Sequence, residues 1–449
     1  MPKKLTGIEI YKLLPKTNCG DCNLPTCMAF AMQVAAKKKA LESCPHVSEE
    51  AKEALGEAQA PPMRTVKIGS GKKEFTMGGE TVLFRHEEKF HHPTGVAIRV
   101  PDNMTKEELQ GHIHNINQLH FVRAGEELGI NLLAVEHRDG DKGKFAETVK
   151  EVMALSDLPL LLVCSETSVL QPALEAAGNS RPLICSATAD NWEEMASLAT
   201  QYQAPLTVKC NTLEECADLT AKIKEKGVED ICLDLTGDTF LQSFSNLIMT
   251  RRLSLEKSFR PLGYPTLVFP TSHQPFERAA EATACICKYC SIVVLEKGDS
   301  WELLPVLTVR QNIYTDPQVP NAIEARLYKI GEPGPEAPVL LTTNFALTYF
   351  TVAGEVESSK TSCFVSVVDT GGLGVLNAYA DDKLTPEVVI KTIQEQGALE
   401  QVQHKKIIIP GLVAVLRMEI QEETGWEVII GPEEAAGLPT FLRNEWRAS

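Results

Sequence analysis

Four cysteines near the start of the chain carry the clearest chemistry in the sequence. Cys19, Cys22, Cys27 and Cys44 are spaced C-x2-C-x4-C-x16-C. A 4Fe–4S cluster needs four thiolates, one for each iron, and Gly20 lets the tight loop curl close to the sulfides. Structural zinc more often uses two C-x2-C pairs, whereas this segment has one. The spacing therefore favours a 4Fe–4S cluster, with zinc as the alternative.

The remaining cysteines are expected to be buried thiols. Cys285, Cys287 and Cys290 lie close together in a helical pattern, but no fourth ligand is near them in the sequence. The other six occur singly on expected strands or helices, where core packing is the ordinary role of a free cysteine. We expect no second metal site from them.

A glycine-rich turn follows an apolar strand near the C-terminus. It reads Asp369-x-Gly371-x-x-Gly374, and glycines after a strand let the backbone approach a bulky cofactor. Corrinoid-binding domains that place a histidine under cobalt carry D-x-H-x-x-G at such a turn, and here Gly371 stands where that histidine would be. A corrinoid held at this turn would lack a protein imidazole below the metal, which lowers the cost of reducing Co(II) to Co(I).

Short apolar runs alternating with helical patterns indicate how these residues are positioned. The first 60 residues form a cysteine domain with helices over about 6–14, 26–41 and 48–58, ended by Pro61 and Pro62. Residues 61–312 predict a (β/α)8 barrel. Nine candidate strands occur there, at 81–85, 96–100, 132–136, 160–164, 183–185, 206–209, 231–235, 266–269 and 292–295. Too few residues separate the first two for a crossover helix, so one of them is expected outside the barrel, and 66–79 is expected to form a hairpin closing its floor.

A proline-rich linker at 313–338 separates the barrel from a second α/β unit at 339–449. Strands are expected at 339–343, 364–368, 407–409 and 428–430, with helical stretches between them, which predicts a small doubly wound, Rossmann-like domain. The fold class is therefore α/β, with three domains of different architecture.

Composition limits the classes of partner. Apolar residues make up 43% of the chain and the net charge is −16, which argues against nucleic acid because phosphate binding needs a basic surface. No apolar run is long enough to span a membrane and no signal peptide is evident. We expect a cytoplasmic protein.

Taken together, these motifs resemble the large (gamma) subunit of the corrinoid iron–sulfur proteins of the acetyl-CoA synthase/decarbonylase system. The resemblance covers the whole chain and includes the cysteine motif and the stretches 83–86, 314–320, 342–345, 407–411 and 425–432. It implies a corrinoid (cobalamin-type) between the C-terminal domain and a small subunit, as a heterodimer. The cofactor-binding residues would be those of the strand-end loops: Thr342, Thr343, Asn344, Thr370, Gly371, Gly372, Leu373, Gly374, Val375, Leu376, Pro410, Gly411, Gly431, Pro432, Glu433, Glu434 and Ala435.

The resemblance also implies the function. Cobalt would accept the methyl group of methyltetrahydrofolate from a methyltransferase and donate it to acetyl-CoA synthase/CO dehydrogenase, in the reductive acetyl-CoA (Wood–Ljungdahl) pathway. The 4Fe–4S cluster would return Co(II) to Co(I), and no protein acid or base is required. One alternative is a pterin-dependent methyltransferase that uses its own barrel, whose strands end in polar residues such as His137 and Asp234. Another is an electron-transfer subunit without corrinoid.

Overall fold

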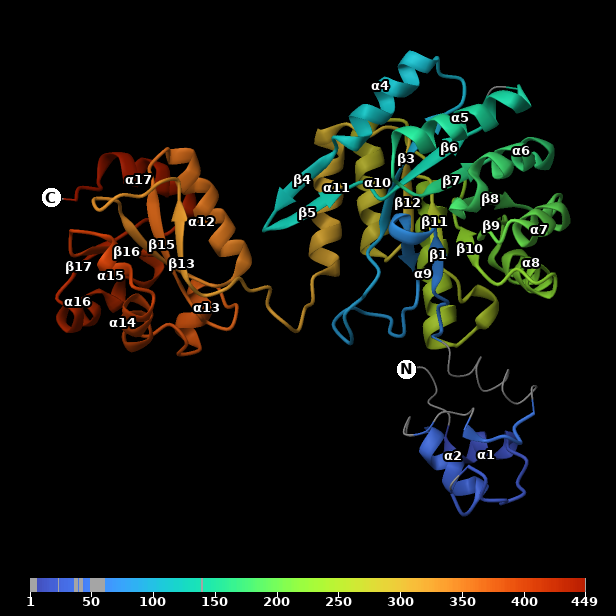
Figure 1. Ribbon diagram of the computed structural model, residues 1–449, viewed down its shortest axis with the longest axis horizontal. Helices are drawn as coiled ribbons and strands as arrows, with labels where there is room; N and C mark the ends of the chain where they lie inside the picture. Colours follow the sequence, from blue (N-terminus) through green and yellow to red (C-terminus); the bar gives the residue numbers. More distant parts are fainter. Residues whose placement is uncertain are drawn as a thin grey trace. The chain divides into compact units, whose positions relative to one another are not determined.

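The computed structural model describes residues 6–22, 24–35, 39, 43–48, 61–138 and 140–448. The chain divides into two compact units, Met1–His120 with Gly129–Tyr314, and Phe121–Leu128 with Thr315–Ser449. Figure 1 shows the small N-terminal helices, the barrel and the C-terminal sheet along the colour gradient. Each part is described by itself below.

The N-terminal segment contains two short helices, α1 (Gly7–Leu13) and α2 (Cys27–Ala35). Thr6 and Glu9 form a capping box, which satisfies the free amides at the start of α1. Ile10 and Phe30 are among the residues that join the helices in one apolar cluster. The expected helix at 6–14 is confirmed. The one at 26–41 ends at Ala35 within the described residues, and nearly all of the one at 48–58 lies outside them.

The central part is a closed parallel barrel with strand order β10-β11-β12-β3-β6-β7-β8-β9. Its strands are β3 (Gly95–Pro101), β6 (Leu132–Glu136), β7 (Leu160–Val163), β8 (Leu183–Ala187), β9 (Leu206–Lys209), β10 (Ile231–Asp234), β11 (Thr266–Val268) and β12 (Ile292–Leu295). Nearly all of their residues are buried, because a parallel barrel is covered on both faces.

One helix follows each barrel strand and covers it on the outside (Figure 1). These are α4 (Lys106–Asn117), α5 (Lys142–Leu155), α6 (Thr167–Ala177), α7 (Trp192–Gln201), α8 (Leu213–Glu225), α9 (Phe240–Arg251), α10 (Pro275–Cys287) and α11 (Ser300–Tyr314). Short 3-10 turns η2 (Gly71–Lys73), η3 (Gly178–Ser180) and η5 (Arg260–Leu262) lie outside the main helices, and a π-helical segment, η4 (Arg252–Glu256), directly continues α9. The (β/α)8 barrel predicted from the alternation is confirmed.

Two hairpins accompany the barrel sequence. β1 (Val66–Ile68) and β2 (Phe75–Met77) pair antiparallel, and Val66, Ile68 and Met77 are buried in the same cluster as the barrel interior. The expected hairpin is therefore confirmed, whereas residues 81–85, one of the nine candidate strands, form no strand. β4 (His120–Arg123) and β5 (Glu126–Gly129) form a further two-stranded sheet, most of which belongs to the second unit.

The C-terminal unit is built on a five-stranded sheet of order β13-β15-β14-β16-β17. Its strands are β13 (Leu327–Ile330), β14 (Val339–Thr343), β15 (Cys363–Val368), β16 (Lys406–Ile409) and β17 (Glu427–Ile430). Its helices and turns are α12 (Ala346–Ser359), α13 (Val375–Ala380), α14 (Pro386–Glu395), α15 (Ala398–Gln401), η6 (Gly411–Leu416), α16 (Arg417–Thr424), η7 (Ala435–Gly437) and α17 (Leu438–Asn444).

Helices cover both faces of this sheet. Leu341 lies in an apolar cluster with residues of α13, α14 and α16, while its neighbour Leu340 lies in a second cluster with residues of α12 and α17. Successive residues of a strand point to opposite faces, so the two clusters are the two layers of a doubly wound domain. The predicted architecture is confirmed.

The segment expected to be a linker contributes an edge strand. β13 lies within 313–338 and pairs antiparallel with β15. The prolines of this segment stand on either side of Leu327–Ile330, and an edge strand needs hydrogen bonds on only one side. This part of the expected linker is therefore built into the sheet.

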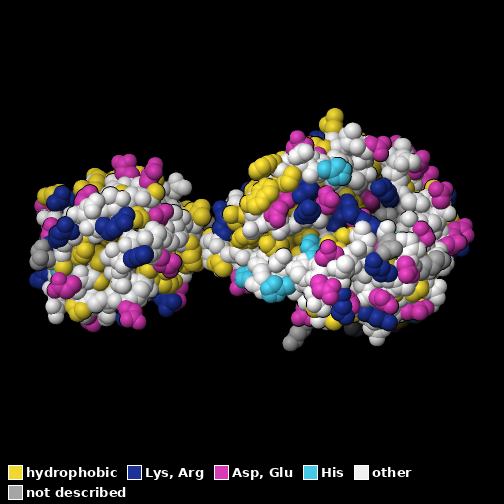
Figure 2. All heavy atoms as spheres, turned by 90° about the horizontal axis from the view of Figure 1, so that it is seen from above, with side chains coloured by type: hydrophobic (Ala, Val, Ile, Leu, Met, Phe, Trp, Pro, Cys, Tyr) yellow, Lys and Arg dark blue, Asp and Glu magenta, His cyan; other side chains and the backbone are white. Residues whose placement is uncertain are grey.

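No helix in the described part of the chain is long and apolar enough to cross a membrane. On the face drawn in Figure 2, acidic side chains are interspersed with basic ones over the barrel. That face offers no continuous basic strip of the kind that tracks a phosphate backbone.

Candidate cluster and cofactor sites

Three of the four N-terminal cysteines lie in one buried cluster. The side chains of Cys22, Cys27 and Cys44 are 7%, 6% and 5% exposed and pack with residues of α1 and α2. Cys19 is exposed. A thiolate set of this kind, mostly shielded from water but open at one corner, suits an iron–sulfur cluster that exchanges electrons with a partner.

One backbone amide donates a hydrogen bond to a cysteine sulfur in this segment. The Asn18 amide lies 3.4 Å from Cys27 Sγ and donates to it, and Asn18 Oδ1 accepts from the Cys27 amide at 2.8 Å. Gly20 has a φ of +84°, a left-handed conformation that favours glycine. Lys39 Nζ donates to the Cys22 carbonyl. The donor set therefore fits an anionic cluster, with both N–H···S bonding and a nearby ammonium group.

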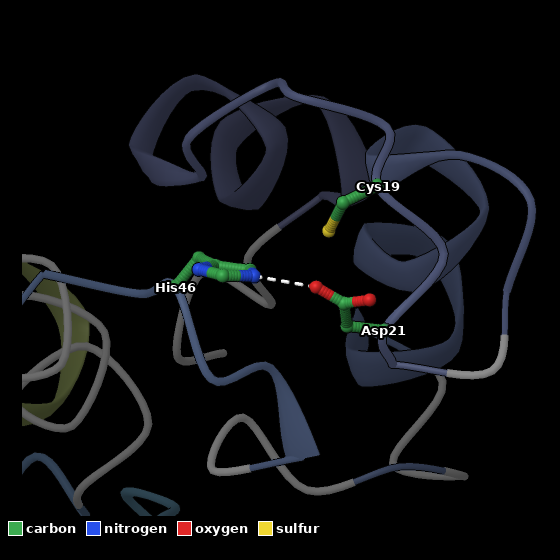
Figure 3. Close-up of side chains that lie close together, drawn as sticks. All are labelled: Cys19, Asp21 and His46. Atoms are coloured by element: carbon green, nitrogen blue, oxygen red, sulfur yellow. Dashed lines mark hydrogen bonds and ion pairs between the residues drawn. The ribbon is translucent and has the colours of Figure 1, made fainter.

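The structure adds two residues that the cysteine spacing does not indicate. Figure 3 shows Asp21 and His46 directed at one another beside Cys19, with 2.6 Å between His46 Nε2 and Asp21 Oδ2. The ligand atoms of all three residues lie within 4.8 Å of one another. Hydrogen bonds from His46 and then Cys19 lower the pKa of Asp21. In the sequence, only their closeness to the cysteines could have indicated Asp21 and His46. Asp21 lies inside the C-x2-C loop, and His46 is two residues after Cys44.

In the C-terminal sheet, a cavity of about 280 Å³ opens at the ends of β14 and β16. The chain runs from β14 to β15 on one side and later returns to β16 on the other, so this is the topological switch point where doubly wound sheets bind ligands. A single register pair, Leu340 with Ile408, joins β14 to β16, whereas five pairs join β14 to β15. The sparse pairing leaves room between the two strands.

Nine of the residues expected to bind a cofactor line this cavity: Thr342, Gly374, Val375, Leu376, Pro410, Gly431, Pro432, Glu433 and Ala435. The other expected residues, which do not line it, are Thr343, Asn344, Thr370, Gly371, Gly372, Leu373, Gly411 and Glu434. Residues of the floor and sides were not anticipated: Leu340, Leu341, Thr348, Val352, Asn377, Ile408, Ile409, Leu412 and Leu438. Strand patterning marks Leu340, Leu341, Ile408 and Ile409 as core, and nothing in the local sequence distinguishes a core residue that lies beside a cavity.

Two buried hydroxyls at this strand end have no partner. Thr342 Oγ1 and Thr343 Oγ1 form no hydrogen bond with any described residue, although the side chains are 2% and 0% exposed. Buried polar atoms are nearly always satisfied in proteins. An unsatisfied hydroxyl at a cavity is therefore a donor or acceptor available to a ligand.

The mouth of the cavity is apolar. Leu376 and Leu412 line it and are 53% and 39% exposed. Val415 and Met418, on η6 and α16 next to Leu412, are 68% and 60% exposed. Neutral, apolar surface beside a cavity with a few polar atoms suits a large, mostly apolar cofactor.

The rim of the barrel is charged, and most of its groups pair with one another. Arg138 Nε donates to Glu136 at 3.0 Å, and Arg99 lies 3.5 Å from the same carboxylate. His137 Nδ1 lies 2.7 Å from Asp102 Oδ2. Burial raises the pKa of Asp234, opposed by Lys209 at 3.9 Å. These pairs are formed within the chain, whereas Arg99 Nε, beside a cavity of about 260 Å³, has no hydrogen-bond partner among the described residues.

The site and fold define a class: a modular α/β protein that combines a four-cysteine segment, a (β/α)8 barrel and a doubly wound sheet with a cavity at its switch point. The family model for the CO dehydrogenase/acetyl-CoA synthase delta subunit matches residues 65–442. The chain therefore belongs to the CO dehydrogenase/acetyl-CoA synthase delta subunit family. A second model, which describes an Fe-S cluster segment, matches residues 14–46 and includes all four cysteines.

Full-length relatives agree with this assignment. The corrinoid/iron-sulfur protein large subunit of Moorella thermoacetica is 43% identical over 439 residues, covering 98% of both chains. The acetyl-CoA decarbonylase/synthase complex subunit gamma of Methanothermobacter thermautotrophicus is 36% identical, again over 98% of both chains. The corresponding subunit of Methanopyrus kandleri is 37% identical over 98% of both.

Proposed function

We propose that this chain carries a methyl group on a bound corrinoid and holds a 4Fe–4S cluster, as part of an acetyl-CoA synthase or decarbonylase system. The observation that carries the proposal is the cavity between β14 and β16, with its apolar mouth and the unsatisfied hydroxyl of Thr342. The name of the Moorella thermoacetica relative, which includes both corrinoid and iron-sulfur, supports it. When bound, a corrinoid supplies a cobalt centre that takes up and releases methyl groups, and the cluster supplies single electrons.

The chain's own part is to hold and shield these groups. Cys19, Cys22, Cys27 and Cys44 would ligate the cluster. Thr342 would donate or accept a hydrogen bond inside the cavity, and Leu376 and Leu412 would exclude water from its mouth. No acid or base of this chain is needed for such a transfer.

A corrinoid in this unit would have no histidine beneath its metal. Residues 315–449 contain one histidine, His404. One ring nitrogen lies 2.8 Å from the Ala337 carbonyl and the other accepts from the Lys406 amide at 3.2 Å. These partners lie just before β14 and at the start of β16, at the edge of the sheet opposite to the cavity. This supports a cofactor without a protein imidazole ligand.

The proposed partners are a small subunit that forms a heterodimer with this chain, a methyltetrahydrofolate methyltransferase, and acetyl-CoA synthase/CO dehydrogenase. The relatives' names, "large subunit" and "complex subunit gamma", support an assembly of this kind. We also propose the domain limits 1–60, 61–312 and 339–449, with β13 of the expected connector 313–338 joined to the last of these domains.

The test is anaerobic co-purification with the small subunit, followed by iron, sulfide and cobalt analysis. We expect about four irons and four sulfides per chain and cobalt equimolar with the chain. Cys27→Ser should lose iron, whereas the control Cys287→Ser, which lies on α10, should retain it. Zinc in place of iron, together with an absence of cobalt, would overturn the proposal, and tight folate binding by this chain alone would favour a methyltransferase.

A further inference from the structure

One carboxamide links the end of β14 to the loop that follows β15, beside the cavity. Asn344 follows β14 directly, is 5% exposed, and does not line the cavity. Its Oδ1 accepts from the backbone amides of Thr370 and Gly372, at 3.0 and 2.9 Å. Its Nδ2 donates to Asp369 Oδ1 at 2.9 Å. Because two main-chain amides point at one atom, that atom must be the oxygen, which fixes the orientation of the amide.

The loop held by Asn344 cannot easily keep its shape by itself. Gly371 and Gly372 have φ of +66° and +78°, and consecutive left-handed glycines are conformationally free in an unfolded or loosened loop. The Thr370 hydroxyl, fully buried, lies within hydrogen-bond distance of both Asn344 Oδ1 and the Leu373 carbonyl. The Asn344 side chain therefore supplies contacts that the loop's own sequence lacks.

The same residue joins the preceding segment to the loop. The Asn344 carbonyl accepts from the Ile323 amide at 2.9 Å, and Ala322 and Phe345 form an isolated β-bridge. A side chain on Gly372 would meet Pro320 Cβ at 2.8 Å. Residues 320–323 thus pack against the loop 369–374. Asn344 contacts both segments, through its main-chain carbonyl and its side chain respectively.

The loop sets one wall of the cavity. Gly374 is the N-cap of α13, and Gly374, Val375 and Leu376 line the cavity directly after the loop. A shift of Thr370–Gly372 would therefore move the residues that follow. We infer that Asn344 is a positioning residue for the corrinoid-binding wall, acting through the loop 369–374; this rests on the proposed function for the identity of the ligand.

A charge-swap pair of variants tests the inference. Asn344→Asp keeps an acceptor for the loop amides but places two carboxylates side by side, since its other oxygen would face Asp369. In the double variant Asn344→Asp/Asp369→Asn, the new amide at 369 can donate to the new carboxylate, which restores the hydrogen bond between the two side chains. The Gly371 amide, which donates to Asp369 Oδ1 at 3.0 Å, loses its acceptor there, so the rescue is partial. Asn191→Asp is the matched control, because Asn191 Oδ1 accepts from the Thr188 amide at 2.7 Å and its Nδ2 donates to the Ser165 carbonyl at 3.0 Å, in the barrel.

The first readout does not need the cofactor. Amide hydrogen exchange of residues 369–374 in the heterodimer should speed up by about tenfold or more in Asn344→Asp, return toward wild type in the double variant, and stay unchanged in Asn191→Asp. Equal exchange in wild type and Asn344→Asp would overturn the inference, as would failure of the double variant to restore protection.

The second readout is corrinoid release, followed by absorbance after dilution under anaerobic conditions. We expect release about tenfold faster in Asn344→Asp and within about threefold of wild type in the double variant. Unchanged release in Asn344→Asp would also overturn the inference. If the wild-type heterodimer holds no corrinoid, the proposed function fails, while hydrogen exchange still decides whether Asn344 shapes the loop.

Discussion

The rim of the barrel and the corresponding edge of the C-terminal sheet, where its parallel strands end, hold equivalent positions in their folds. Their side chains are nevertheless of different kinds. Both collect the loops that follow the carboxyl ends of parallel strands, where α/β proteins usually bind ligands. At the barrel rim the side chains are charged and pair with each other, as Arg138 does with Glu136 and His137 with Asp102. At the sheet edge the residues that line the cavity are uncharged apart from Glu433, and the hydroxyls of Thr342 and Thr343 have no partner among the described residues.

The difference lies in how far the polar groups of each region are already paired. A charged rim can be largely structural when most of its charges have a partner, because breaking such a pair costs more than the pair contributes. At the sheet edge, the buried hydroxyl of Thr342 lines a cavity and has no partner among the described residues, so a bound ligand can supply the missing hydrogen bond. The following predictions test this contrast, beginning with the largest expected effect.

Breaking a buried ion pair at the barrel rim should destabilise the fold strongly. Arg278 on α10 donates to both oxygens of Glu302 on α11 at 2.7 and 2.8 Å, and the two side chains are 3% and 0% exposed. Arg278→Met leaves Glu302 buried without a partner, so the free energy of unfolding should fall by about 3–5 kcal/mol. Denaturant unfolding measures it, and Lys391→Met, in the exposed pair with Glu395, is the control. Equal losses in the two variants would contradict a structural role for the rim charges.

Narrowing the cavity should abolish cofactor retention with little change in stability. Gly374 lines the cavity, and a Cβ there would meet its neighbours at ordinary distances of 3.6 and 3.8 Å. Gly374→Leu should therefore fold, but its side chain should compete for the cavity and weaken corrinoid retention by about a hundredfold. Cobalt content after anaerobic gel filtration measures this, with Gly374→Ala as the milder variant. Full cobalt occupancy in Gly374→Leu would place the cofactor elsewhere.

Removing a threonine hydroxyl should affect stability differently at the barrel rim and at the edge of the C-terminal sheet. Thr236 at the barrel rim accepts from the Phe269 amide at 2.9 Å, so Thr236→Val should cost about 1–2 kcal/mol of unfolding free energy by leaving that amide unpaired. Thr342 has no such partner, so Thr342→Val should leave the cofactor-free protein as stable as wild type or more stable. It should nevertheless speed corrinoid release by about fivefold. Thermal unfolding and corrinoid release are measured for both variants. A comparable loss of stability in Thr236→Val and Thr342→Val would contradict the proposed difference between the barrel rim and the sheet edge.

The pH dependence of stability should show a small signature of Asp234. Burial raises the pKa of this carboxyl above its ordinary value of 3.8, so the folded state binds the proton more tightly than the unfolded state. Its contribution to stability is therefore greatest at low pH and is lost as the pH rises through the folded-state pKa. Asp234→Asn should remove this dependence, so that the stability of wild type relative to the variant declines as the pH rises. A relative stability that instead increases with pH would mean that Lys209 outweighs burial.

Patterns local in the chain predicted the elements well. The alternation of apolar runs and helical stretches predicted the barrel and the doubly wound sheet, and the prediction of a hairpin at 66–79 was correct. Residues 81–85 have a strand-like composition but form none, because a barrel of eight strands is already closed and offers no further partner. β13 was overlooked since prolines flank it, and its pairing with β15 depends on residues about 35 positions away.

The sequence by itself determined the metal chemistry and the fold class. Residue type and short spacing are sufficient to indicate a cluster of four cysteine ligands, and periodicity is sufficient to indicate strands and helices. Only the tertiary structure decided where β14 and β16 separate, which hydroxyls are left without partners, that His46 meets Asp21, and that Asn344 holds a loop 25 residues further along the chain. These features depend on how distant segments pack, because a hydrogen bond or a gap is a property of two surfaces and cannot be assigned from one of them.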